Sequence, residues 1–232
     1  MTSASSIVTR IYWVVTIALF GAGILLAAYY APVETTMGVV QKIFYLHLPV
    51  AITMFVACFV VFLASIAYLW HRERRWDDLA HAGAEVAVLF ASVVLLTGMT
   101  WGRSAWGHWW TWSPRLTFSL ILWLLYVVYL MVRTSIESPQ RRAIVAAVYA
   151  IVAFLDVPLV YFSAKLLPDI HPDSISLEPP MGRTVLFWFL PVLMLYAGAI
   201  RARYRILRTL GARRDVAAEE TPVEHVRAGE SA

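Results

Sequence analysis

Six long apolar runs constrain what this chain can fold into. A helix needs roughly 20 mostly apolar residues to cross the hydrocarbon core of a bilayer, and runs of about that length lie at residues 11–30, 43–69, 83–100, 116–133, 143–163 and 184–200. They fill most of the 232 residues, of which 60% are hydrophobic. The pattern predicts an all-α integral membrane protein, a bundle of six transmembrane helices joined by short loops.

Arginine and lysine set the expected orientation of these helices. Loops rich in these residues stay in the cytoplasm, and arginines precede the first run and cluster after the second, between the fourth and fifth, and after the sixth. We therefore expect both termini in the cytoplasm and the connection between the third and fourth runs outside. This topology explains the sequence pI of about 9.3 without a nucleic-acid partner.

The chain divides into a six-span membrane domain, residues 1–214, and a tail, residues 215–232. The tail is rich in glutamate and alanine and poor in apolar residues, so we expect a disordered cytoplasmic segment. Cys58 is the single cysteine and lies within the second apolar run. The chain alone therefore forms neither a disulfide nor a CxxCH haem attachment site.

The segment 101–115, WGRSAWGHWWTWSPR, holds half of the ten tryptophans, namely Trp101, Trp106, Trp109, Trp110 and Trp112. An interfacial aromatic belt is one explanation, but five tryptophans in one short connection exceed that need. Their spacing does not place them on one helical face, and Gly102 and Gly107 relax the backbone between them. The segment predicts a shallow aromatic platform that suits a large, flat aromatic ligand.

Two histidines lie on the same expected outer side as this platform. His47 opens the second apolar run, where an imidazole is costly without a partner, and His171 lies between prolines in the loop before the sixth run. A histidine at the end of a span is often a hydrogen-bonded interfacial residue. Two that bracket an aromatic platform instead favour bis-histidine axial ligation of haem iron.

Haem propionates require cations at the wet edge of a site. The outer candidates are Arg103, Arg115, Lys165 and Arg183, and each has an alternative role in pairing with lipid headgroups. Arg115 is the favoured propionate partner because it directly follows the tryptophan segment and begins a span.

Two further polar residues have open roles. His108 lies within the tryptophan segment, where it is either a third ligand, a proton carrier or, as we favour, an exposed interfacial residue. Asp156 lies within an apolar run, two residues before Pro158. A carboxylate there is expensive and faces the bundle interior, so a structural role at a proline kink and a functional role are both open.

Three segments resemble one family. Residues 101–117 resemble the tryptophan-rich signature of the haem-handling proteins of cytochrome c biogenesis. The YLHLP sequence around His47 resembles the first histidine motif of the CcmC branch of these proteins, and the stretch from the DVP sequence at 156–158 to His171 resembles its fifth span and following loop. With six spans and short loops, the similarity covers nearly the whole chain.

The resemblance implies a function of ligand handling and hand-off rather than catalysis. CcmC-like proteins hold b-type haem transiently at the outer face of the inner membrane and present it to the haem chaperone CcmE, alongside the ABC-transporter subunits CcmA and CcmB, with CcmD as a further candidate partner. Carried over by position, His47 and His171 are the axial ligands of the haem iron. Four tryptophans then form the haem platform, Trp106, Trp109, Trp110 and Trp112.

The chain departs from the family pattern in two places. Ser113 stands where the family signature has an acidic residue after the last tryptophan, which removes a carboxylate beside Arg115. Leu166 and Leu167 replace an aromatic pair before the second histidine, so that wall of the site is expected to be less aromatic.

Two other functions compete with haem hand-off, and a plain transporter is a weaker third because no discontinuous helix at the membrane midplane is evident apart from Pro158. A cytochrome c synthase of the CcsA kind shares the tryptophan signature but has more spans and a large outer domain. A membrane b-type cytochrome needs histidine pairs within facing spans, so that haem lies inside the bilayer, whereas His47 and His171 are expected at one edge.

Overall fold

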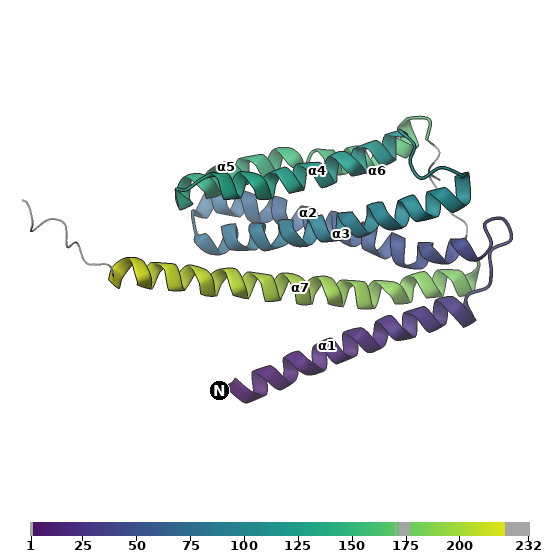
Figure 1. Ribbon diagram of the computed structural model, residues 1–232, viewed down its shortest axis with the longest axis horizontal. Coiled ribbons are helices and arrows are strands. Elements are labelled where there is room, and N and C mark those ends of the chain that lie inside the picture. Colours follow the sequence, from purple (N-terminus) through teal and green to yellow (C-terminus); the bar gives the residue numbers. More distant parts are fainter. Residues whose placement is uncertain (1, 170, 172–176, 221–232) are drawn as a thin grey trace, which may run out of the picture.

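Long helices form almost all of the described chain (Figure 1). The structure, a computed structural model, describes residues 2–169, 171 and 177–220. In chain order its elements are α1 (Thr2–Leu25), the π-helical turn η1 (Leu26–Tyr30), the 3-10 turn η2 (Val39–Ile43), α2 (Phe44–His71), α3 (Arg74–Trp106), α4 (Pro114–Ser135), α5 (Pro139–Ala153), α6 (Asp156–Leu166) and α7 (Pro179–Glu220).

Six helical segments are long and apolar enough to cross a membrane, which confirms the predicted six-span, all-α fold. They are Ser6–Tyr30, Val39–His71, Arg74–Trp106, Pro114–Ser135, Pro139–Ser163 and Pro179–Arg213. The fifth span is interrupted, because α5 ends at Ala153 and α6 begins at Asp156. Pro158 has no backbone N–H to donate to the preceding turn, so the break lies where the sequence placed a proline kink.

Two helices extend into segments that were expected to be loop or disordered. The third span was expected to end near residue 100, but α3 continues to Trp106 and takes part of the tryptophan segment with it. The last helix continues to Glu220, past the expected start of a disordered tail at residue 215. The remainder of that predicted tail, residues 221–232, lies outside the described residues.

Helices α2 and α3 form the centre of the bundle and make its most extensive helix contact. Small side chains line this contact, including the buried Ala57 and Ala64 of α2 and Ala84 and Ala87 of α3. Gly83 lies so close to α2 that an added Cβ would come within 2.9 Å of the Val61 side chain. Small residues let neighbouring helices approach closely in a membrane, where packing rather than hydrophobicity drives their association.

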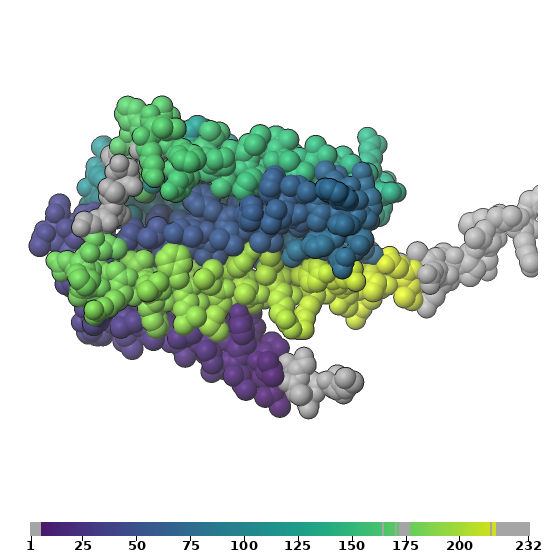
Figure 2. Space-filling model, turned by 180° about the vertical axis from the view of Figure 1, so that it is seen from behind, coloured from purple at the N-terminus to yellow at the C-terminus, as the bar shows by residue number. Residues whose placement is uncertain are grey.

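Helix α1 lies at the edge of the bundle along α7 (Figure 2). Two glycines make room for large aromatic residues in this contact. An added Cβ at Gly198 would lie 2.8 Å from the Trp13 ring, and one at Gly23 would lie 2.9 Å from the Trp188 ring. The start of α1 and the end of α7 lie toward one end of the bundle, and the end of α3 that carries part of the tryptophan segment lies at the opposite end (Figure 1).

Ion pairs join three helices toward the end of the bundle where the termini lie. Arg133 of α4 donates to both carboxylate oxygens of Asp77 of α3, at 2.6 and 2.8 Å. The Arg133 side chain is only 5% exposed. Arg203 of α7 likewise donates to both carboxylate oxygens of Glu85 of α3. These pairs fix α4 and α7 against the central helix.

We predict that Arg133→Ala lowers the free energy of unfolding by about 3 kcal/mol, because it leaves the Asp77 carboxylate, which is 13% exposed, without its partner. The double variant Asp77→Ala/Arg133→Ala should lose less than the single one. The matched control is Arg75→Ala, which removes an exposed ion pair with Glu73 and should change stability by less than about 1 kcal/mol. Unfolding in detergent measures all three, and a double variant less stable than Arg133→Ala would contradict the prediction.

Candidate haem site

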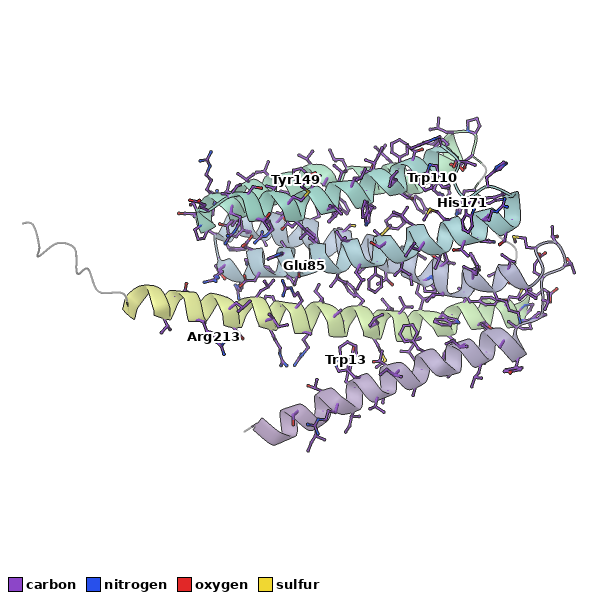
Figure 3. The ribbon with its side chains drawn as sticks, in the orientation of Figure 1. Trp13, Glu85, Trp110, Tyr149, His171 and Arg213 are labelled. Atoms are coloured by element: carbon purple, nitrogen blue, oxygen red, sulfur yellow. The ribbon has the colours of Figure 1, made fainter. Side chains whose placement is uncertain are left out.

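A cavity opens among α2, α3, α4 and α6 at the end of the bundle that carries the tryptophan segment. It has a volume of about 290 Å³, at the lower end of the range typical of small-molecule sites. Its walls are mainly aliphatic and aromatic side chains, and His47, Arg115, Lys165 and His171 contribute polar groups. Figure 3 shows His171 and Trp110 together at this end of the molecule, with Glu85 well away from them.

His47 lies in the first turn of α2 and is 9% exposed. Its Nδ1 atom is 2.8 Å from the hydroxyl oxygen of Thr97 on α3, and that hydroxyl donates its own hydrogen to the Val93 carbonyl at 2.7 Å. Because a hydroxyl has one hydrogen to donate, Nδ1 of His47 is the donor in the first of these bonds. The neutral ring then has its lone pair on Nε2, the form required of a metal ligand.

The space beside His47 depends on Gly98, one residue after Thr97. A Cβ at Gly98 would lie 3.4 Å from the imidazole Cε1 atom, at the short limit of ordinary van der Waals contact. On another side, the edge of the His47 ring meets Trp101, with 5.9 Å between ring centroids. Neighbours on α3 therefore fix both the tautomer and the orientation of this imidazole.

The predicted tryptophan platform is divided between helix and loop. Because α3 continues to Trp106, the expectation that all five tryptophans lie in a loop is wrong. Gly107 ends the helix with a positive φ of 78°, a conformation that glycine adopts without strain. Trp101, Trp106 and Trp110 line the cavity, whereas Trp109 and Trp112 are 61% and 76% exposed and are not among its lining residues.

The three tryptophans that line the cavity form an aromatic wall with polar edges. Trp101 is 3% exposed and stacks on Trp106 with an angle of 26° between the rings. The indole N–H groups of Trp101 and Trp110 are buried and have no hydrogen-bond partner among the described residues. A buried donor without an acceptor is costly, so these two groups suit a ligand that carries acceptor atoms.

Arg115 joins the beginning of α4 to the loop that carries the second histidine. Its guanidinium donates from Nη1 to Nδ1 of His171, with the two atoms 3.0 Å apart, and from Nη2 to the Tyr161 carbonyl at 3.1 Å. A guanidinium has donors and no acceptor. Nδ1 of His171 therefore accepts this hydrogen bond and carries a lone pair, the opposite tautomer from His47.

Asp169 is a site residue that the sequence analysis missed. One carboxylate oxygen accepts the backbone N–H of Arg115 at 2.7 Å, and the other accepts the backbone N–H of His171 at 2.8 Å. Ser113, at the N-cap of α4, makes no side-chain capping bond. Asp169 therefore supplies from a distant loop the carboxylate that caps α4, and it holds the two proposed haem-binding residues together.

The remaining candidate cations divide between the cavity lining and contacts elsewhere. Lys165 lines the cavity. Arg103, a predicted propionate partner, is not among the lining residues and donates instead to the Gly107 carbonyl at the end of α3. Arg183 donates to the Tyr30 hydroxyl, and His108 is exposed. The structure thus places two of the four candidate cations, Arg115 and Lys165, at the cavity.

Asp156 lies outside the lining of this cavity. It begins α6 and is 6% exposed, and its Oδ2 atom has no hydrogen-bond partner among the described residues. Its position at the break between α5 and α6 agrees with a structural role at the interrupted span.

Comparison with known proteins shows the same similarity over most of the chain. The family model described as heme exporter protein C, CcmC, matches residues 1–227. The heme exporter protein C of Rhodobacter capsulatus is 30% identical over 190 residues, 80% of this chain and 78% of that protein. That of Haemophilus influenzae is 29% identical over 199 residues, 82% of this chain and 80% of that protein.

A third relative aligns over a shorter stretch. The heme exporter protein C of Bradyrhizobium diazoefficiens is 36% identical over 142 residues, 61% of this chain. The aligned part spans 54% of the Bradyrhizobium protein's length. Because the family model covers almost the entire sequence, the chain belongs to the heme exporter protein C family.

Proposed function

We propose that this membrane protein binds haem in the cavity at the outer face of the cytoplasmic membrane and hands it on for c-type cytochrome biogenesis. The observation that carries the proposal is the meeting of His47 and His171 at one cavity, although they lie far apart in the sequence. Two imidazoles with an aromatic wall and cations are the groups that a haem requires. Its relatives are named heme exporter protein C.

His47 and His171 are the proposed axial ligands of the haem iron. Thr97 already holds His47 in the tautomer with its lone pair on Nε2. Trp101, Trp106 and Trp110 supply apolar contact and stacking from the cavity wall. The exposed Trp109 and Trp112 remain proposed members of the platform, at its outer rim.

Cations at the cavity are the proposed partners of the two propionates. Arg115 offers a planar pair of donors that matches a carboxylate, and Lys165 offers a second positive charge on the α6 side. The wall remains apolar between them, so the macrocycle would be held by burial and the carboxylates by charge. We retain the exposed Arg103 as an auxiliary candidate, although it does not line the cavity.

Hand-off requires binding that is specific but not permanent, since the recipient has to hold the ligand more tightly than the donor. We propose the haem chaperone CcmE as recipient, with CcmA, CcmB and CcmD as neighbours in the complex. The arginine-rich connections lie at the end of the bundle opposite the cavity and favour both termini in the cytoplasm, so we propose that the cavity faces outside. The protein acts here by binding and transfer, with no chemical turnover.

We predict that the purified, haem-loaded protein has the low-spin absorption spectrum of bis-histidine haem, and that His47→Ala and His171→Ala each abolish it. His108→Ala, which removes an exposed histidine outside the cavity lining, is the matched control and should leave the spectrum unchanged. A low-spin spectrum that persists in both site variants would contradict the assignment of His47 and His171 as axial ligands. It would favour a b-type cytochrome with haem inside the bilayer.

Thr97→Val should lower haem affinity by about 10- to 100-fold, because losing the partner of a ligating histidine frees its tautomer and ring orientation. Thr97→Ser keeps the hydroxyl and should bind nearly as well as wild type. Thr100→Val, three residues further along α3 at a threonine whose hydroxyl donates to the Leu96 carbonyl at 2.8 Å, is the control. Haem titration followed by absorbance measures all three, and equal affinities for the valine and serine variants would refute the role of Thr97.

Asp169→Ala should convert six-coordinate, low-spin haem largely to a five-coordinate form held by His47, because His171 loses its backbone anchor. Adding Ser113→Asp to this variant tests the cause, since aspartate at the N-cap restores a helix cap without restoring the bond to His171. We expect no recovery of the low-spin spectrum. Full recovery would mean that Asp169 acts only as a cap for α4. Glu178→Ala, in the same loop, is the matched control.

A further inference from the structure

We infer that Arg115 exchanges partners when haem binds, leaving His171 for a haem propionate, so that carboxylate capture and ligation by His171 are coupled. The inference rests on the proposed function and adds a specificity to it. The site would recruit its second axial ligand only for a porphyrin that carries a free carboxylate.

The starting point is the hydrogen bond between Arg115 and His171. The Nη1 atom of Arg115 donates to Nδ1 of His171 over 3.0 Å, so the Nδ1 lone pair is occupied. In a neutral imidazole the other nitrogen, Nε2, then carries the proton. In this state neither nitrogen of His171 can offer a lone pair to a metal ion.

Ligation by His171 therefore requires Arg115 to withdraw, whichever nitrogen binds iron. If Nδ1 is the ligand, its lone pair has to be released from the guanidinium. If Nε2 is the ligand, its proton has to leave and a proton has to be taken up at Nδ1, where the guanidinium donor now lies. The ring gains and loses one proton in the second case, so the exchange leaves its charge unchanged.

A propionate is well suited to displace the imidazole from Arg115. Hydrogen bonds between a guanidinium and a carboxylate are stronger than those to a neutral acceptor, and the planar fork of the guanidinium can engage both oxygens. Arg115 and His171 both line the same cavity, so a ligand that reaches one reaches the other. A negatively charged acceptor inside the cavity therefore competes directly with the imidazole for the same donor.

The backbone contacts keep the two residues in place during such an exchange. Asp169 holds the N–H groups of Arg115 and His171 at 2.7 and 2.8 Å, and neither bond involves the exchanging side chains. Rotation of the Arg115 side chain would then free the His171 ring without moving the loop. His47 needs no corresponding step, because Thr97 already leaves its Nε2 lone pair available.

The test compares haem with haem dimethyl ester, in which both carboxylates are blocked, bound to the purified full-length protein in mild detergent. Absorption and electron paramagnetic resonance spectra give the fraction of six-coordinate, low-spin iron. Wild type should be low-spin with haem and lose most of that fraction with the diester. Arg115→Leu should regain the low-spin form with the diester, and Arg115→Leu/His171→Ala should lose it again. Arg115→Lys, which keeps a donor and a charge without the planar fork, should still lose low-spin iron with the diester.

Each outcome separates the exchange from the proposed ligand pair. Wild type that is low-spin with both haem and the diester overturns the exchange alone. Wild type that lacks the low-spin form with haem overturns the ligand pair and the exchange with it. The wild-type comparison needs no substitution, so the inference stays falsifiable even if Arg115→Leu fails to fold.

Discussion

The close approach of α2 to α3 is the contact on which the rest of the structure depends. Alanines and Gly83 let the two backbones come together, and α4, α5 and α7 pack against this pair. The same approach brings Thr97 of α3 within hydrogen-bond distance of His47 on α2. In a membrane, where association relies on packing, the small residues that build the core also set the geometry of one proposed ligand.

Much of the fold could be predicted because its causes are local. Apolar runs of bilayer length predict spanning helices, and Pro158 predicts the interruption of the fifth span. The limits of the third span could not be found in this way. The sequence from Thr100 to Trp106 is less apolar than the run before it, yet it continues the helix until Gly107 turns the chain. The error about the tryptophan loop follows from that boundary.

The residue types of the candidate site could be predicted from the sequence, but their arrangement in space could not. Histidine, tryptophan and arginine were singled out for their chemistry, and the cavity contains members of each class. Thr97 and Asp169 were missed because an ordinary threonine in an apolar helix and an aspartate in a loop carry no distinctive pattern. Their roles depend on contacts across 50 or more positions of the chain. One available clue was Ser113, which stands where the family signature has an acidic residue and leaves the beginning of α4 without a carboxylate of its own.

The two histidines differ in a way that suits a protein that releases its ligand. His47 is buried, oriented by α3 and ready to coordinate, whereas His171 lies on a loop and is held by Arg115. Two permanently prepared ligands would hold haem more firmly than one, which would oppose the proposed hand-off. When the propionate leaves Arg115, the guanidinium can return to His171 and withdraw one axial ligand. Loss of the contact between the propionate and Arg115 would thereby weaken the contact between His171 and the iron. Haem would then be released in successive steps, and no single step would have to break every contact.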